Sequence, residues 1–134
     1  MNYFRKWTLT AIATLCIVTL SLIPIPDDPP LEGVPFIDKW VHFVMYGGIV
    51  GAIWFDKLLY HSPCNIAAWA VSAFLYATAI GGLMELIQNQ TSYRSGDWID
   101  FLADIFGAAL GTLICLPLYK FCAQSLLKKD NLLC

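Results

Sequence analysis

Charged residues are scarce in this sequence: 8 lysines and arginines and 10 aspartates and glutamates make up 13% of its 134 residues. Soluble domains carry about 25% charged and about 45–50% apolar residues, whereas 58% of this chain is hydrophobic. A soluble globule of this size buries only about two-thirds of its unfolded surface, which is too little to hide so many apolar side chains. The composition therefore excludes a disordered protein, a soluble nucleic-acid-binding protein and a multidomain enzyme, and it predicts a small integral membrane protein.

Several common sequence patterns are also missing. The chain has no internal repeat, no low-complexity tract and no signature of an activated nucleophile. Its five cysteines are not spaced like metal ligands, and none falls in a predicted extracytoplasmic loop. We therefore expect neither a cysteine metal site nor a framework of disulfides.

Long uncharged runs predict the helices that cross the membrane. A helix needs about 20 residues of low polarity to span a bilayer, and residues 7–26 and 66–84 contain no charge. Two shorter runs, 41–55 and 105–119, reach that length only when they are extended through charged residues. Prolines and polar segments separate the runs. We predict an all-α membrane protein with a single domain, residues 1–134, in which four transmembrane helices form an antiparallel bundle at about 7–24, 37–56, 66–88 and 97–120.

The distribution of lysine and arginine predicts the orientation in the cell membrane. The first apolar run offers no small-x-small cleavage site, which favours an uncleaved anchor over a signal peptide. With the N-terminus in the cytoplasm, six of the eight basic residues lie inside, and only Lys39 and Arg94 lie outside. Positive charge favours the cytoplasmic side, so we predict that both termini are cytoplasmic.

Polar side chains gather at the predicted outer ends of three helices. Residues three or four apart share one face of a helix, and a carboxylate costs about 2.5–3.5 kcal/mol to insert at mid-membrane facing lipid. We therefore expect these side chains to face the bundle and to line an acidic pocket that opens outward. The predicted ligand-binding residues are Asp38, Lys39, His42, Tyr46, Glu85, Gln88, Arg94, Asp97, Asp100 and Asp104.

Glycine pairs lie below this pocket on two of the helices. Small residues four apart let membrane helices approach closely, and the sequence has such pairs at Gly47 with Gly51 and at Gly107 with Gly111. We predict that these glycines form a packing seam that seals the pocket. The same surfaces allow an oligomer.

The predicted pocket has an excess of negative charge. Five carboxylates face Lys39 and Arg94, and a charged His42 still leaves the sum negative. A network of buried ion pairs that serves structure alone is one interpretation, but such a network is expected to balance. The imbalance calls for protonated acids or a bound cation: an ammonium or peptide amine, or a divalent cation held by His42, Asp100 and Asp104. The spacing matches no specific metal motif, and the sequence identifies no cofactor.

The same residues resemble a known family. Asp38-Lys39-x-x-His42-Phe43-x-x-Tyr46 is similar to the first signature of the VanZ-like family of small membrane proteins. The residues of the second signature are Glu85, Gln88, Arg94, Asp97, Asp100, Gly107 and Gly111. The resemblance covers about half of the chain, residues 38–111. One position departs from it, because the family usually carries Asn where this chain has Asp104.

The resemblance implies a multi-pass bacterial membrane protein. The founding member of the family is linked to low-level resistance to teicoplanin, a glycopeptide that binds cell-wall precursors, and the family has no established reaction. We therefore expect a protein that binds a cell-envelope component, such as a lipid-linked precursor or its peptide, and contributes to glycopeptide resistance.

Two other functions fit the same residues. In a membrane enzyme acting on a lipid-linked phosphate or a cell-wall precursor, His42 with Glu85 or Asp100 would supply acid–base chemistry. Lys39 and Arg94 would hold the phosphate. The third hypothesis is a structural partner subunit of another membrane protein.

Overall fold

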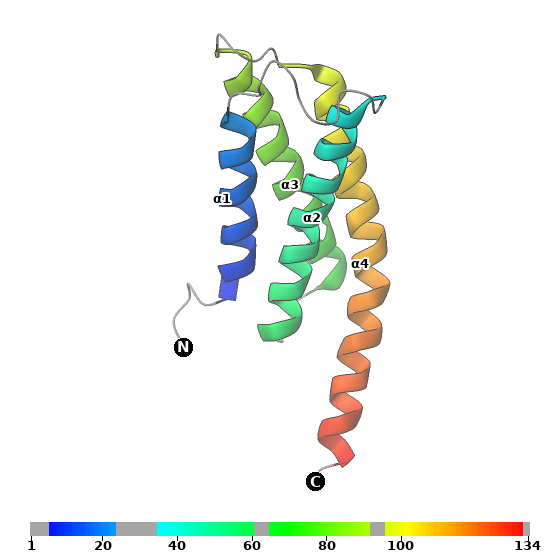
Figure 1. Ribbon diagram of the computed structural model, residues 1–134. Coiled ribbons are helices and arrows are strands. Elements are labelled where there is room, and N and C mark those ends of the chain that lie inside the picture. Colours follow the sequence, from blue (N-terminus) through cyan, green and yellow to red (C-terminus); the bar gives the residue numbers. More distant parts are fainter. Residues whose placement is uncertain (1–5, 24–34, 61–64, 92–95, 133–134) are drawn as a thin grey trace.

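The computed structural model is an all-α bundle of four helices, and it describes residues 6–23, 35–60, 65–91 and 96–132, with side chains up to Ser125 (Figure 1). The helices are α1 (Thr8–Leu22), α2 (Ile37–Tyr60), α3 (Ile66–Gln88) and α4 (Trp98–Leu132). Three segments are long and apolar enough to cross a membrane: α2, α3 and Trp98–Ser125 of α4. Helix α1 is equally apolar but has only 15 residues. The all-α class and the presence of four helices are thus confirmed.

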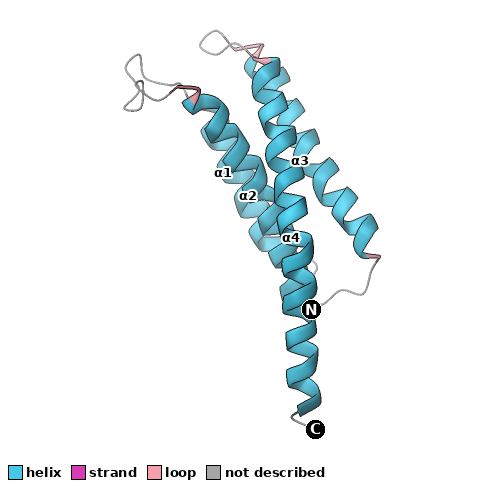
Figure 2. Cartoon of the chain, turned by 90° about the vertical axis from the view of Figure 1, so that its right-hand side faces the viewer, coloured by secondary structure: helices cyan, strands magenta, loops and turns pink. Residues whose placement is uncertain are grey.

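Two helices end later than the sequence predicts. Helix α2 continues beyond residue 56 to Tyr60, because the neighbouring helices bury the charged side chains of Asp56 and Lys57. Helix α4 continues beyond residue 120, where the chain contains neither glycine nor proline. Its 35 residues make a helix of about 52 Å. That exceeds the roughly 30 Å of a bilayer core, and α4 protrudes past the other helices (Figure 2).

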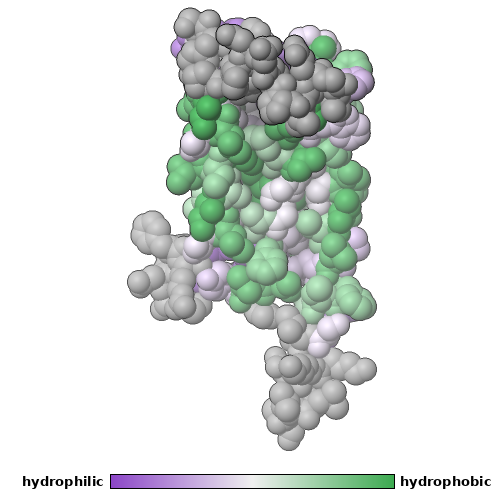
Figure 3. Space-filling view, viewed as in Figure 1, coloured by the Kyte–Doolittle hydropathy of each residue, from purple (hydrophilic) through white to green (hydrophobic). Residues whose placement is uncertain are grey.

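The core lies along α2, which contacts the three other helices. Its fully buried side chains include Tyr46, Ile49 and Val50, and they pack with alanines from α3 and with Ala108 of α4. Large apolar side chains point outward from all four helices, and the face in Figure 3 is mostly hydrophobic between its two ends. An apolar outer surface of this extent is suited to contact with lipid.

Glycines bring α2 and α4 into backbone contact. A Cβ atom added at Gly107 would overlap the carbonyl group of Phe43. A Cβ atom at Gly111 would lie 3.0 Å from the carbonyl oxygen of Gly47. At Gly51, in contrast, an added Cβ would meet no atom within 4 Å. The close contact therefore uses Gly47, Gly107 and Gly111 but not the fourth glycine of the predicted seam.

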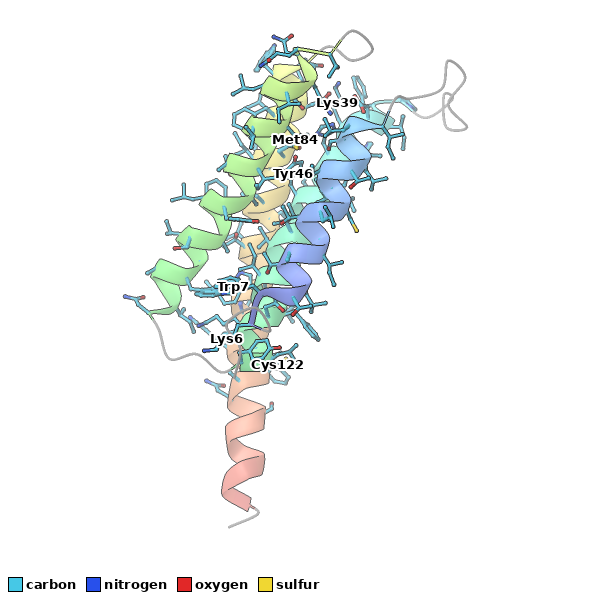
Figure 4. The ribbon with its side chains drawn as sticks, turned by 90° about the vertical axis from the view of Figure 1, so that its left-hand side faces the viewer. Lys6, Trp7, Lys39, Tyr46, Met84 and Cys122 are labelled. Atoms are coloured by element: carbon cyan, nitrogen blue, oxygen red, sulfur yellow. The ribbon has the colours of Figure 1, made fainter. Side chains whose placement is uncertain are left out.

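Polar bonds hold α1 at both of its ends. At its start, the buried carboxylate of Asp56 accepts hydrogen bonds from the backbone N–H of Thr10 and from its hydroxyl, both at 2.8 Å. At its end, the Gln88 side chain donates to the carbonyl oxygen of Ser21 at 2.9 Å. Beside the first turn of α1, an apolar cavity of about 470 Å³ is lined by Trp7, Thr10 and Ala11 together with residues from α3. Helix α3 diverges from the bundle toward Ile66 (Figures 2 and 4).

Candidate functional site

Charged side chains of three helices meet at one end of the bundle. They come from the first turns of α2, the last turns of α3 and the first turns of α4. Lys39 lies at this end, whereas Trp7 and Cys122 lie toward the other (Figure 4). We call this set the acidic/histidine cluster. Its described members are Asp38, Lys39, His42, Glu85, Asp97, Asp100 and Asp104.

The outer part of the cluster is built around Lys39. The Lys39 Nζ lies 2.7 Å from Asp100 Oδ1, 3.0 Å from Asp97 Oδ2 and 3.6 Å from Asp38 Oδ2. One ammonium group thus joins the start of α2 to the start of α4. Asp97 precedes the first residue of α4 and accepts a hydrogen bond from the N–H of Ile99 at 2.9 Å, as N-cap residues do. This hydrogen bond and the nearby Lys39 lower the pKa of Asp97.

The inner part of the cluster is built around His42. The His42 Nδ1 lies 2.9 Å from Asp104 Oδ1 and 3.9 Å from Glu85 Oε1. Asp104 is fully buried and Glu85 is only 9% exposed. Glu85 Oε2 accepts a hydrogen bond from the Asp97 N–H at 2.8 Å. The other two oxygens, Glu85 Oε1 and Asp104 Oδ2, find no hydrogen-bond donor among the described residues.

Gly81 of α3 makes room for the buried carboxylate of Asp104. A Cβ atom at Gly81 would lie 2.6 Å from Asp104 Oδ2 and 3.1 Å from Asp104 Cγ. The fully buried ring of Tyr46 lies one turn below His42, with the two ring centroids 6.3 Å apart. Its hydroxyl also has no hydrogen-bond partner among residues whose positions are described. Three buried polar atoms around the inner part of the cluster, Glu85 Oε1, Asp104 Oδ2 and the Tyr46 hydroxyl, are thus without a hydrogen-bond partner among the described residues.

Two sets of three side chains are spaced closely enough to share a metal ion. In each set, one ligand atom per residue lies within 4.8 Å of the others. The outer set is Asp38, His42 and Asp100, and the inner set is His42, Glu85 and Asp104. The metal ligands predicted from sequence are His42, Asp100 and Asp104. In the structure, Asp100 belongs to the outer set and Asp104 to the inner set, and His42 belongs to both.

Two apolar grooves reach the cluster from the sides of the bundle. The first, of about 440 Å³, lies between α3 and α4 and has Glu85 in its lining together with Leu86, Trp98 and Phe101. The second, of about 430 Å³, lies between α2 and α4 and includes Lys39 in an aromatic lining. One amphipathic molecule can therefore place its charged group in the cluster and its apolar chain in a groove.

A family model described as VanZ/LLP1 matches residues 2–121 of the chain. The chain belongs to the VanZ/LLP1 family. The resemblance that the sequence motifs suggest is thereby confirmed, and with it a multi-pass helical membrane protein. Comparison with curated proteins and with solved structures gives no match.

In this VanZ-family chain, most of the predicted pocket residues do come together. Seven of the ten form the cluster itself, and Tyr46 lies directly beneath it. Gln88 has a different partner, because its amide donates to α1. Arg94 lies outside the described residues.

Sequence reasoning missed a second buried polar group, at the opposite end of the bundle. Asp56 accepts hydrogen bonds from the first turn of α1. The Lys57 Nζ lies 4.5 Å from the ring centroid of Trp69 and 5.4 Å from that of Tyr119. The only signal in the sequence was the adjacent pair Asp56 and Lys57 after the uncharged run 41–55, and such a pair looks like the end of a span. The hydrogen-bond donors and aromatic rings that surround this pair come from distant parts of the chain.

Proposed function

We propose that this VanZ-family protein is a cell-envelope protein of the cytoplasmic membrane that binds the polar end of a lipid-linked envelope component. The polar end would lie in the acidic/histidine cluster and the lipid chain in a lateral groove. By holding this component, the protein would alter the access of a teicoplanin-type glycopeptide to its target. One observation carries the proposal: Glu85, a nearly buried carboxylate of the cluster, also lines an apolar groove on the side of the bundle.

The proposed topology has four spans with both termini in the cytoplasm. Helix α1 begins and α4 ends at the same end of the bundle, away from the cluster (Figures 1 and 4). Six of the eight lysines and arginines precede α1, lie near the end of α2 or lie in the second half of α4. Because positive charge favours the cytoplasmic side, this orientation turns the cluster toward the outside. Envelope precursors and glycopeptides meet there.

The charge of the cluster favours a ligand that brings positive charge with it. Five carboxylates lie near one ammonium group, that of Lys39, and one imidazole. Even with both bases charged, the described cluster is negative. A peptide amine satisfies this requirement directly, and a phosphate satisfies it when a cation accompanies it. Membrane-embedded ionisable groups usually mark a functional site.

Teicoplanin susceptibility tests this proposal. The chain is expressed in a susceptible host, and the minimal inhibitory concentration is measured for the wild type, for Glu85→Ala and for Asp100→Ala. Both variants are expected to lose the resistance that the wild type confers. Lys120→Gln is the control, because it removes an exposed charge at the far end of the bundle and should keep resistance.

The amount and folding of each variant in the membrane decide how the result is read. Membrane fractions are compared by immunoblot and by size-exclusion chromatography in detergent. The proposal is wrong if Glu85→Ala and Asp100→Ala reach wild-type levels in folded form and still confer full resistance.

A membrane enzyme is the second candidate, and one contact favours it. Asp104 holds the Nδ1 of His42 at 2.9 Å, and a carboxylate that orients an imidazole in this way is common in acid–base catalysis. The predicted substrate class is a lipid-linked phosphate. Purified protein incubated with polyprenyl phosphate and divalent metal ions should then release inorganic phosphate. We favour binding because the sequence carries no signature of an activated nucleophile.

The third hypothesis, a structural partner subunit, makes a different prediction. Cluster variants would then disturb the assembly of another membrane protein and leave the response to lipid or glycopeptide unchanged. Crosslinking in intact membranes followed by size analysis separates this outcome from ligand binding.

A further inference from the structure

We infer that His42, Glu85 and Asp104 form a binding site for one divalent cation of the first transition row, Mn²⁺ or Zn²⁺. The inference deepens the proposed function and rests on it in one respect: the ion would face the anionic group of the lipid-linked component. Each of the three central helices supplies one ligand, α2 through His42, α3 through Glu85 and α4 through Asp104.

The distances among the ligand atoms suit a single ion. Nitrogen and oxygen ligands lie about 2.0–2.2 Å from such metals, so neighbouring ligand atoms around one ion are roughly 3–3.6 Å apart. The observed separations are 2.9 Å from His42 Nδ1 to Asp104 Oδ1 and 3.9 Å from His42 Nδ1 to Glu85 Oε1. The ligand atoms of Asp104 and Glu85 lie within 4.8 Å of each other, so small side-chain movements would bring all three ligands into one coordination sphere.

Unpaired oxygens point to a ligand independently of these distances. Asp104 is fully buried, yet its Oδ2 has no hydrogen-bond donor in the described part of the chain. Glu85 Oε1 likewise is buried and has no hydrogen-bond donor among the described residues. A buried acceptor that loses its water without gaining a partner costs about 1–3 kcal/mol, and more when it is charged. A cation bound to Glu85 Oε1 and to both oxygens of the Asp104 carboxylate would remove this cost for both residues.

The balance of charge selects the inner set over the outer one. A neutral imidazole and two carboxylates carry a charge of −2, which one divalent cation neutralises. In the outer set, Asp100 already has the ammonium of Lys39 at 2.7 Å, and Asp38 has it at 3.6 Å. A second cation there would meet like charge. The donors of the inner set, one nitrogen and carboxylate oxygens, suit Zn²⁺ and Mn²⁺.

The position of Glu85 specifies what the ion would recognise. Because Glu85 lines the groove between α3 and α4, an ion on its carboxylate can be reached from that groove. Open coordination positions on such an ion bind phosphate oxygens. The inference thus narrows the ligand class to a lipid that carries a phosphate group, with its chain along Leu86, Trp98 and Phe101.

Titration with Mn²⁺ tests the site in the full-length chain purified in detergent. Electron paramagnetic resonance follows the loss of the free Mn²⁺ signal, and Zn²⁺ is added as a competitor. We expect one Mn²⁺ per chain and displacement by Zn²⁺. Glu85→Gln and Asp104→Asn should each weaken Mn²⁺ binding by about 10- to 100-fold. Asparagine has nearly the shape of aspartate, so Asp104→Asn is expected to fold.

Asp130→Asn is the matched control for charge. It removes one carboxylate near the end of α4, which lies at the opposite end of the bundle from the cluster. Its Mn²⁺ affinity should stay within about threefold of the wild type. The inference is overturned if the wild type shows no saturable Mn²⁺ binding, or if Asp130→Asn weakens binding as much as Glu85→Gln does.

These results can be told apart from failure of the proposed function. If Glu85→Gln loses teicoplanin resistance but binds Mn²⁺ like the wild type, the cation site is refuted and the proposed function stands. If Glu85→Gln loses Mn²⁺ binding but keeps resistance, the cation site is supported and the proposed function fails.

Discussion

Replacing Gly107 with alanine is the most direct test of how the cluster is held together. Gly107 lies on α4, three residues after Asp104, and the atom it contacts is the carbonyl oxygen of Phe43, the residue after His42. A Cβ atom at this position overlaps that carbonyl group. Because the obstacle is backbone, no side-chain rotation relieves it, and the two helices have to move apart.

The size of the effect follows from two opposing terms. Alanine gains about 1 kcal/mol over glycine in helix propensity. Overpacking costs about 1–3 kcal/mol or more, and a gap of about 1 Å forfeits a quarter to a half of each dispersion contact across it. Since α2 and α4 share the largest interface of the bundle, we expect Gly107→Ala to lower the free energy of unfolding by about 2 kcal/mol.

Gly51→Ala is the matched control, because the added methyl group meets nothing within 4 Å. It should gain up to about 1 kcal/mol from helix propensity alone. Unfolding of each purified protein in mixed micelles is followed by circular dichroism during SDS titration. The reasoning is refuted if Gly107→Ala and Gly51→Ala unfold at the same SDS fraction. The same separation should lengthen the 2.9 Å contact between His42 and Asp104, so Gly107→Ala should also bind Mn²⁺ more weakly.

Two further predictions concern single carboxylates. Asp56→Ala leaves the N–H groups of Leu9 and Thr10 without their acceptor and should lower the free energy of unfolding in the SDS titration by about 1–3 kcal/mol. Asp56→Asn keeps one acceptor oxygen and should lower it less. Equal stability of both variants and the wild type would contradict the role of Asp56 in holding α1. Asp97 has a pKa lowered by the Ile99 N–H and then by Lys39, so its stabilising effect is complete above the unfolded pKa near 4 and is lost as the pH falls further. Asp97→Asn should therefore lose less stability than the wild type between pH 5 and pH 3, as measured by the same SDS titration. If both proteins lose the same free energy of unfolding over this pH range, the contact with Lys39 is contradicted.

The long apolar helices could be predicted because their signals are local. The uncharged run 66–84 contains most of α3, and the bounds 66–88 agree with the structure. Step sizes of three and four residues placed Asp97, Asp100 and Asp104 on one face of the predicted helix 97–120, and all three side chains do belong to the cluster. Periodicity within one helix and the high cost of exposing charge to lipid are sufficient for such inferences.

The partners within the cluster could not be predicted in the same way. Which carboxylate pairs with Lys39 and which with His42 depends on the depth at which α4 crosses α2, and Gly107 sets that depth through its contact with Phe43. A shift of one turn would exchange Asp100 and Asp104. Likewise, the hydrogen bond of Gln88 with Ser21 depends on where α1 packs, which no spacing within α3 reveals.

The two buried polar groups of the bundle differ in a way that separates a structural role from a binding role. At one end, Asp56 receives N–H and O–H donors from α1 at 2.8 Å, and the Lys57 ammonium lies over two aromatic rings. At the other end, Glu85 and Asp104 each keep one oxygen without a donor among the described side chains and backbone, although both are buried. Burial of an acceptor is tolerated when the protein supplies its partner. Where the described residues supply no partner, a cation bound to the carboxylate oxygens would do so. Both ends of the bundle hold buried carboxylates, so it is the unpaired oxygens beside His42 that favour a bound cation.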